Sequence, residues 1–285
     1  MSGAAFSATG RIGWRQRLQR HRGARAGGAV LLLMAALAIL GPLLSPHGAD
    51  VVNWDAIEQA PSAAYLFGTD SVGRDLFSRL MLATGISLAL GLLATVVSVV
   101  IGIGWGAVAG LAGGRVDALM MRIVDVLYAM PFLFFVIVLM AVFGRSLWLI
   151  FIGVGAVEWL TLARIVRGQT LLLKNQPFAE AARACGAGPW RLLTRHIVPN
   201  LLGLVAVYAT LTVPQVILVE SFLSFLGLGV QEPLTSLGVL VKEGVETLET
   251  APWLILIPSL WLAALLLALN LVGDALRDAF DPKDR

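Results

Sequence analysis

The segment EAARACGAGPWRLLTRHIVPN, from Glu180 to Asn200, identifies the class of fold. It is polar and basic, yet a long apolar run lies on each side of it. A charged segment between two apolar runs is a loop outside a membrane, and an excess of arginine places such a loop on the cytoplasmic side. Glu180 and the alanines after it favour helix, whereas Gly186, Gly188 and Pro189 interrupt it. The segment is therefore predicted to form a helix–turn–helix in a cytoplasmic loop.

The composition extends this prediction to the whole chain. Apolar residues make up 58% of the sequence and charged residues 14%. A soluble domain carries about 25% charged residues, so most of this surface is expected to face lipid. Runs of about 20 apolar residues can cross a bilayer as helices, whereas an open sheet would leave backbone groups unpaired there. The prediction is an all-α membrane protein with six transmembrane helices, at 28–44, within 84–111, and at 118–143, 147–166, 201–219 and 253–272.

Basic residues predict the orientation. Arginines from Arg11 to Arg25 precede the first span, so that side is predicted to be cytoplasmic. With six spans both termini are cytoplasmic. A count of five or seven spans would no longer place most of the basic residues on the cytoplasmic side. With six spans, every lysine and arginine falls on or near the cytoplasmic side except Arg74, Arg79, Arg145 and Lys242.

The first apolar run admits two interpretations. A basic front before an apolar core is also typical of a cleaved signal peptide. The run ends in Ser45-Pro46-His47 without a small-residue cleavage pattern, and its removal would leave an odd number of spans, so we expect a retained anchor. Residues 1–27 are expected to form a basic cytoplasmic tail at the anionic lipid surface. Nucleic-acid binding is not expected, because Trp14 is the one aromatic residue among the arginines of 11–25.

Residues 45–82 are predicted to lie on the outer side of the membrane. The stretch 67–80, FGTDSVGRDLFSRL, contains Thr69 and Asp70, either of which is a candidate helix cap. Leu76 and Leu80 share one helical face. The stretch is therefore predicted to form an amphipathic helix at the membrane surface.

Several motifs resemble one known family. The pattern E-A-A-x-x-x-G from Glu180 to Gly186, followed by I-x-P, resembles the EAA signature of permease subunits in ATP-binding-cassette (ABC) importers. The stretch 67–80 is similar to L-G-T-D-x-x-G-R-D-x-x-S-R in the C-type permease of dipeptide, oligopeptide and nickel systems, with Phe67 replacing leucine. Residues 220–229, ESFLSFLGLG, continue the resemblance, which covers nearly all of 28–285. Leu237, where the family usually has tryptophan, and Ser259, where glycine is common, depart from it.

The resemblance implies the type I permease fold of ABC importers and a division of labour between chains. In that family the loop, here 168–200, docks into a separate ATPase, so ATP and Mg²⁺ are expected on partner subunits. This chain itself is expected to bind no cofactor or metal and to catalyse no reaction. The expected partners are a homologous B-type permease, two ABC ATPases and a solute-binding protein outside the bacterial inner (plasma) membrane. The residues expected to dock the ATPase are Glu180, Ala181, Ala182, Arg183, Gly186, Ala187 and Trp190, supported by Arg164, Arg167, His196 and Pro199.

The predicted organisation follows from these segments. The basic tail 1–27 is followed by the first helix 28–44 and the outer segment 45–82. A five-helix core, 83–273, contains the cytoplasmic loop 168–200. Residues 274–285 form a cytoplasmic tail. Arg164 and Arg167 lie three residues apart on one helical face. Two roles stay open for them, which are anchoring at the membrane interface and pairing with Glu180 or another acid of the loop.

Charged residues inside predicted spans are candidates for a substrate path. Glu158 has no partner nearby in the sequence, whereas Asp125 lies within one turn of Arg122, which predicts an ion pair there. Structural pairing or packing is the alternative role for every candidate. The substrate-path candidates are Tyr128, Met130, Pro131, Glu158, Glu220 and Ser221.

The sequence lacks two motifs that are typical of ATPases and metalloproteases. The sequence has no G-x-x-x-x-G-K-[ST] phosphate loop and no H-E-x-x-H pattern. Two alternatives from other classes are an ion-coupled secondary transporter, which predicts inverted repeats, and a non-transporting scaffold. Peptides are the first candidate substrate and nickel or another small solute the second. The second span has glycines that indicate close helix packing, namely Gly102, Gly104, Gly106 and Gly110.

Overall fold

The computed structural model describes residues 22–143 and 147–280, and these ranges are helical apart from loops and one isolated bridge between Thr69 and Asp75. The predictions for residues 1–21, Arg145 and 281–285 lie outside the described residues. The helices are α2 (Arg22–Leu44), α3 (Leu76–Ala112), α4 (Gly114–Ala129), α5 (Phe132–Phe143), α6 (Leu147–Leu173), α7 (Pro177–Ala184), α8 (Pro189–Leu192), α9 (Val198–Phe225), α10 (Leu237–Glu246) and α11 (Trp253–Phe280).

Within the residues that the structure describes, four stretches are long and apolar enough to cross a membrane. They are Arg22–Pro42, Leu76–Ala112, Pro189–Phe225 and Trp253–Ala279. The pair α4 and α5 passes the same test together, as a span bent by 85°. The prediction of an all-α chain with several apolar spans is thus confirmed for the described residues.

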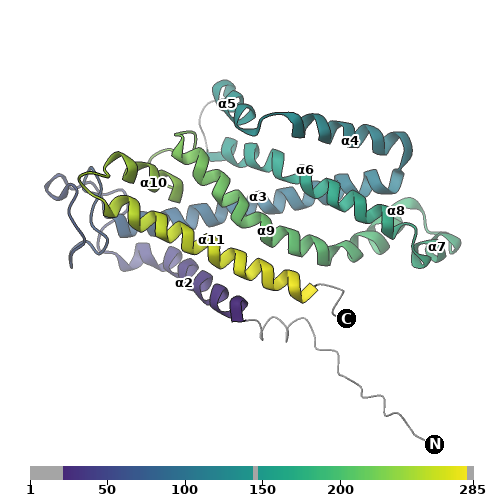
Figure 1. Cartoon of the computed structure of the whole chain (residues 1–285), viewed down its shortest axis with the longest axis horizontal. Helices are drawn as coiled ribbons and strands as arrows, with labels where there is room; N and C mark the ends of the chain where they lie inside the picture. Colours follow the sequence, from purple (N-terminus) through teal and green to yellow (C-terminus); the bar gives the residue numbers. More distant parts are fainter. Residues whose placement is uncertain (1–21, 144–146, 281–285) are drawn as a thin grey trace, which may run out of the picture.

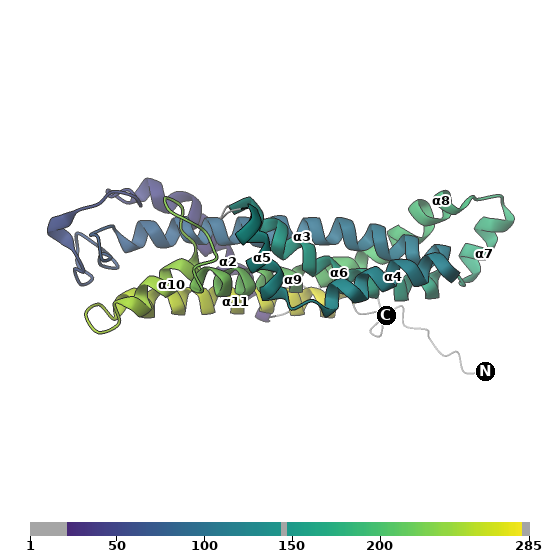
Figure 2. The ribbon, with the colours of Figure 1, turned by 90° about the horizontal axis from the view of Figure 1, so that it is seen from above.

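The molecule is elongated, and its two ends differ. The long helices α3, α6, α9 and α11 run along the long axis in Figure 1. The irregular segment between α2 and α3 lies with α10 at one end, and α7 and α8 lie at the opposite end in both views (Figure 1, Figure 2). One buried cluster, which includes Leu80, Met81 and Ile217, joins α2, α3, α9, α10 and α11. A second, which includes Val166 and Ile197, lies beside α7 and α8.

Glycines allow α3 and α6 to approach closely. A Cβ atom at Gly102 would lie 2.9 Å from the Cβ of Leu162, and one at Gly110 would lie 2.8 Å from the Cβ of Thr170. A Cβ at Gly106 would collide with the carbonyl oxygen of Ala163. The predicted close packing is confirmed at these three positions but is wrong at Gly104, whose Cβ would meet nothing within 4 Å.

This contrast supplies a matched test. Replacing Gly106 with leucine should prevent normal packing of α3 on α6, because the added atoms would meet backbone that cannot move aside. Gly104→Leu should be tolerated, since that position faces open space. The measurement is the yield and melting temperature of the detergent-solubilised chain. Equal melting temperatures for the two variants would contradict the packing account.

The prediction for the stretch 67–80 is wrong in one respect. Leu76 to Leu80 form no separate surface helix; they are the first turns of α3, and Leu76, Arg79 and Leu80 are buried. The helix cap is Asp75, whose side chain accepts a hydrogen bond from the backbone N–H of Ser78. Neither Thr69 nor Asp70 caps it, because Thr69 donates to the carbonyl of Ala56 and Asp70 binds arginines.

The predicted third span is also interrupted. α4 ends at Ala129, Met130 is extended, and α5 begins at Phe132 after Pro131. Proline has no backbone N–H and disfavours helix at the residue before it, which explains the break at this point. The span predicted at 118–143 is therefore two helices bent by 85° and not one continuous helix.

Candidate functional site

The loop singled out by the sequence is a helical hairpin. Pro177 occupies the first turn of α7, a place where its missing N–H costs nothing, and Pro189 does the same in α8. Gly186 follows α7 with φ +81°, a conformation that glycine adopts without steric cost. The N–H of Gly186 donates to the carbonyl of Arg183 (2.9 Å), and that of Ala187 to the carbonyl of Ala182 (3.0 Å). These two bonds form a Schellman cap, and the predicted helix–turn–helix is confirmed.

The hairpin is seated by its small residues. Ala179 is fully buried and Ala182 partly buried, in a cluster with Ala107 of α3 and Val166 of α6. Glu180, Ala181 and Arg183 lie on the exposed side of α7. Ala182 therefore faces the body of the chain, and only its neighbours face a possible partner.

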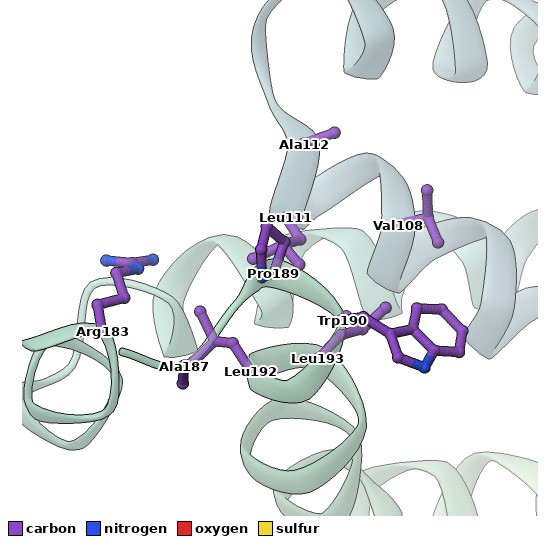
Figure 3. A pocket seen from close by; sticks show the side chains of 9 residues that line it. All are labelled: Val108, Leu111, Ala112, Arg183, Ala187, Pro189, Trp190, Leu192 and Leu193. Carbon is purple, nitrogen blue, oxygen red and sulfur yellow. The ribbon is translucent and has the colours of Figure 1, made fainter. Parts of the chain in front are cut away.

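A pocket of about 720 Å³ opens beside the hairpin. Its walls come from the last turns of α3 and from α7, the turn and α8, as Figure 3 shows. Arg183 is the one charged lining residue, and the Trp190 side chain at the rim is 72% exposed. Such an apolar surface suits an inserted apolar side chain. The lining residues are Val108, Leu111, Ala112, Arg183, Ala187, Pro189, Trp190, Leu192 and Leu193.

Two hydrogen bonds that the sequence did not predict link the hairpin through Lys174 to α3. The Nζ atom of Lys174 donates to the carbonyl of Gly110 (2.6 Å), and Arg183 donates to the carbonyl of Lys174 (2.9 Å). Asn200 donates to the carbonyl of His196 (2.6 Å), while Pro199 lies exposed in the first turn of α9. The hairpin is thereby fixed relative to the long helices, so force applied to it reaches them.

The two supporting arginines bind α4 and not the loop. Arg167 forms two hydrogen bonds to Asp117 (2.9 and 2.6 Å). Arg164 donates to Asp125 (2.9 Å) and lies 4.3 Å from the ring centre of Tyr128. The predicted pairing with Glu180 or another loop acid is wrong, and so is the predicted pair of Asp125 with Arg122. Sequence spacing within one helix could not reveal partners on another.

The substrate-path candidates divide into two groups. Tyr128, Met130 and Pro131 are exposed at the bend between α4 and α5, and Glu158 of α6 is half-buried. Tyr208 of α9 lies within electrostatic range of both Glu158 and Tyr128. This first group therefore gathers around one region of α4, α6 and α9.

The second group is enclosed. Glu220 is 1% exposed and accepts hydrogen bonds from Ser224 (2.6 Å) and Ser87 (3.4 Å). Ser224 also accepts from Ser236, the cap of α10. Ser221 is buried too, against the backbone at Gly238. This network joins α3, α9 and α10, which favours the structural role for Glu220 over a place on an open path.

At the end of the molecule opposite the α7–α8 hairpin, two arginines bind a network of acidic side chains. Arg79 is 2% exposed and donates to Asp70 and, through both terminal nitrogens, to Glu243. Arg74 donates to Asp70 (2.7 Å) and Glu232 (2.8 Å). Both arginines were exceptions to the predicted charge distribution, and these acids balance their charges. The network also joins the irregular segment, α3, the loop before α10 and α10 itself.

The network shifts the pKa values of its members. Burial acts to lower the pKa of the Arg74 guanidinium, but hydrogen bonds to Glu232 and Asp70 outweigh burial and raise it above its ordinary value. The hydrogen bond from Arg74 in turn lowers the pKa of Glu232 below its ordinary value of 4.5.

A pH dependence follows for Glu232. Because its pKa is lower in the folded chain, its ion pair contributes fully above pH 4.5 and is lost as the pH falls through the folded pKa. The Glu232 side chain is 67% exposed, so solvent screening keeps the effect below about 1 kcal/mol. We expect Glu232→Gln to melt slightly below the native chain at pH 7, and we expect the difference to shrink as the pH falls below 4.5. A difference that grew on acidification would contradict this.

Comparisons with known proteins agree with this architecture. Residues 102–285 match the family described as binding-protein-dependent transport system inner membrane component, and residues 10–61 match the N-terminal TM domain of oligopeptide transport permease C. The chain is 47% identical to the oligopeptide transport system permease protein OppC of Haemophilus influenzae over 97% of its own length and 90% of the relative's. For OppC of Escherichia coli K12 the identity is 49%, over 95% and 90%. For the dipeptide transport system permease protein DppC of Bacillus subtilis it is 43%, over 95% and 85%. The chain therefore belongs to the family of binding-protein-dependent transport system inner membrane components.

Proposed function

We propose that this chain forms half of the membrane pathway of an ATP-driven importer of peptides, and that the α7–α8 hairpin transmits the work of a separate ATPase. The observation that carries the proposal is the hairpin's construction. It is capped, seated on α3 and α6 through Ala179 and Ala182, and exposed through Glu180, Ala181 and Trp190. A rigid element with an exposed face can pass a partner's motion to the long helices.

Peptides are proposed as the substrate because the relatives at 43–49% identity are named for oligopeptide and dipeptide transport. A solute-binding protein would deliver the peptide on the side of α10. A homologous permease would complete the pathway, and two ATPase subunits would hold ATP and Mg²⁺ on the side of α7.

We further propose six spans with both termini cytoplasmic. The spans would be α2, α3, the bent pair α4–α5, α6, α9 and α11, and α6 is about 40 Å long at 1.5 Å per residue. This assignment puts α7 and α8 on one side and α10 with the irregular segment on the other, in agreement with their places at opposite ends in Figure 1. In that view the start of α2 and the end of α11 point toward the end of the molecule at which α7 and α8 lie.

The test is purification of the tagged chain with its co-expressed partners, followed by reconstitution into vesicles. We expect a second permease and an ATPase to co-purify, and labelled tripeptide uptake to require ATP on the hairpin side. Uptake driven by a proton or sodium gradient without ATP would support the secondary-transporter alternative. Partners without any solute flux would support a scaffold.

A further inference from the structure

Glu158 is an acidic side chain in the middle of the proposed span α6. It lies about 17 Å from Leu147, the first residue of α6, at 1.5 Å per residue. The hydrocarbon core of a bilayer is about 30 Å thick, so the carboxylate lies near its midplane. Among the residues that the structure describes, none forms a hydrogen bond or an ion pair with this half-buried carboxylate. A charged side chain is costly at this depth, and its presence there indicates a function.

The arginines of α6 do not neutralise Glu158. Arg164 donates to Asp125 (2.9 Å), and Arg167 donates to Asp117 (2.9 and 2.6 Å). Each of these pairs is neutral as a whole. Glu158 therefore adds one negative charge that no described side chain of this region balances.

Ser98 of α3 lies at the level of Glu158. Along the contact between the two helices, Gly102 faces Leu162 and Gly106 faces Val166, so a step of four residues on α3 matches a step of four on α6. One turn earlier, the same register places Ser98 opposite Glu158. Ser98 is 1% exposed, and its hydroxyl has no hydrogen-bond partner among the described residues. A buried hydroxyl normally has such a partner, so two polar groups at one level of the α3–α6 contact lack the partners that their chemistry requires.

Two tyrosines lie near Glu158. Tyr208 of α9 is within electrostatic range of both Glu158 and Tyr128. Tyr128 is 51% exposed at the bend between α4 and α5, and its ring centre lies 4.3 Å from the guanidinium of Arg164. Tyrosine rings attract cations through their π faces, and a carboxylate attracts them by its charge. The surroundings of Glu158 are therefore suited to a positively charged group.

We propose that Glu158 binds the N-terminal ammonium group of the peptide midway across the membrane. The inference rests on the proposed function, which supplies a substrate with an ammonium at one end and a carboxylate at the other at neutral pH. The negative charge of Glu158 attracts the first end and repels the second. An ammonium group carries three hydrogen-bond donors and no acceptor, so it matches the carboxylate and the hydroxyl of Ser98, which can both accept.

Removing the charge without changing the shape tests the role of Glu158. In proteoliposomes that contain the transporter and its loaded binding protein, Glu158→Gln should lower the ratio of labelled tripeptide taken up to ATP hydrolysed about tenfold, because a hydrogen bond to a charged group is lost. Glu158→Asp should restore most of that ratio. Thr210→Val of α9 is the matched control, because Thr210 is half-buried and its hydroxyl already donates to the carbonyl of Val207 (2.8 Å). An unchanged ratio for Glu158→Gln would overturn the inference.

Two photoreactive peptides test which end of the substrate Glu158 binds. Photoleucyl-alanyl-alanine carries the reactive group beside its ammonium, and alanyl-alanyl-photoleucine carries it beside its carboxylate. During ATP-driven uptake the first peptide should label α6 around Glu158 and α4 around Tyr128, and Glu158→Gln should remove this labelling. The second peptide should not label these positions. Equal labelling by both peptides, or labelling by neither, would contradict the proposal.

The other outcomes are distinguishable. If Glu158→Gln lowers the amount of chain in the membrane or the recovery of its partner subunits, Glu158 has a structural pairing role and the inference is wrong. If the native chain takes up peptide with a sodium or proton gradient and without ATP, the proposed function itself fails. Native ATP-driven uptake that Glu158→Gln leaves unchanged overturns this inference alone.

Discussion

Replacing Gly186 with proline should abolish ATP-dependent peptide uptake and leave the chain inserted in the membrane. Gly186 has φ +81°, whereas proline is restricted to about −65°. Proline also lacks the N–H that Gly186 donates to the carbonyl of Arg183. The turn would have to rebuild, which would misplace the exposed face of α7, while the apolar spans that determine insertion would be untouched.

A graded series makes this prediction specific. Gly186→Asn should retain most uptake, because asparagine tolerates a positive φ, and Gly186→Ala should be intermediate, at a cost of about 1 kcal/mol. Gly188→Ala is the control, since Gly188 has φ −66° and open space around it. The measurements are uptake of a labelled tripeptide into proteoliposomes and the amount of chain in the membrane fraction. Normal uptake by the proline variant would refute a role for the hairpin in coupling.

Replacing Arg79 with leucine should be the most destabilising change at the opposite end. The Arg79 side chain is 3% exposed, and it neutralises Asp70, which is 4% exposed, and Glu243. Without Arg79, Asp70 keeps Arg74, but Glu243 loses its hydrogen-bonded partner. Removing one partner of a buried ion pair costs up to about 3–5 kcal/mol. The variant should melt well below the native chain and lose the ion pair between α3 and α10.

The control for Arg79 is a simpler and more exposed ion pair, in which Arg164 makes one hydrogen bond to Asp125. Arg164 and Asp125 are 40% and 57% exposed, so Arg164→Leu should cost no more than about 1 kcal/mol. Melting temperatures of the two variants in the same detergent give the comparison. If both variants melt alike, burial does not determine the strength of the network at Arg79.

Features that depend on neighbouring residues were predictable. Glycine and proline interrupt helices in most sequence contexts. The positions of Gly186, Gly188 and Pro189 therefore located the hairpin before any tertiary contact was known. The apolar runs predicted membrane helices for the same reason. Pro131 lies at the break between α4 and α5, but the sequence did not predict the angle of 85° between these helices.

Features that depend on distant residues were predicted poorly. For Arg164 and Arg167 the sequence left two roles open, anchoring at the membrane interface or pairing with Glu180 or another loop acid, and it identified no partner on another helix. Their true partners, Asp125 and Asp117, are 39 and 50 residues away, on a helix that lies beside α6. Arg79 looked like an exposed cation of a surface helix, because its acids Asp70 and Glu243 come from two other segments.

The sequence by itself determined the class of the protein and the place of its hairpin, because helix breakers and the length of apolar runs act locally. Only the tertiary structure decided that Ala182 faces inward, that α4 is held by α6 and that a pocket opens beside Trp190. These depend on how helices far apart in the chain cross and in what register, and the register is set by many small packing contacts at once.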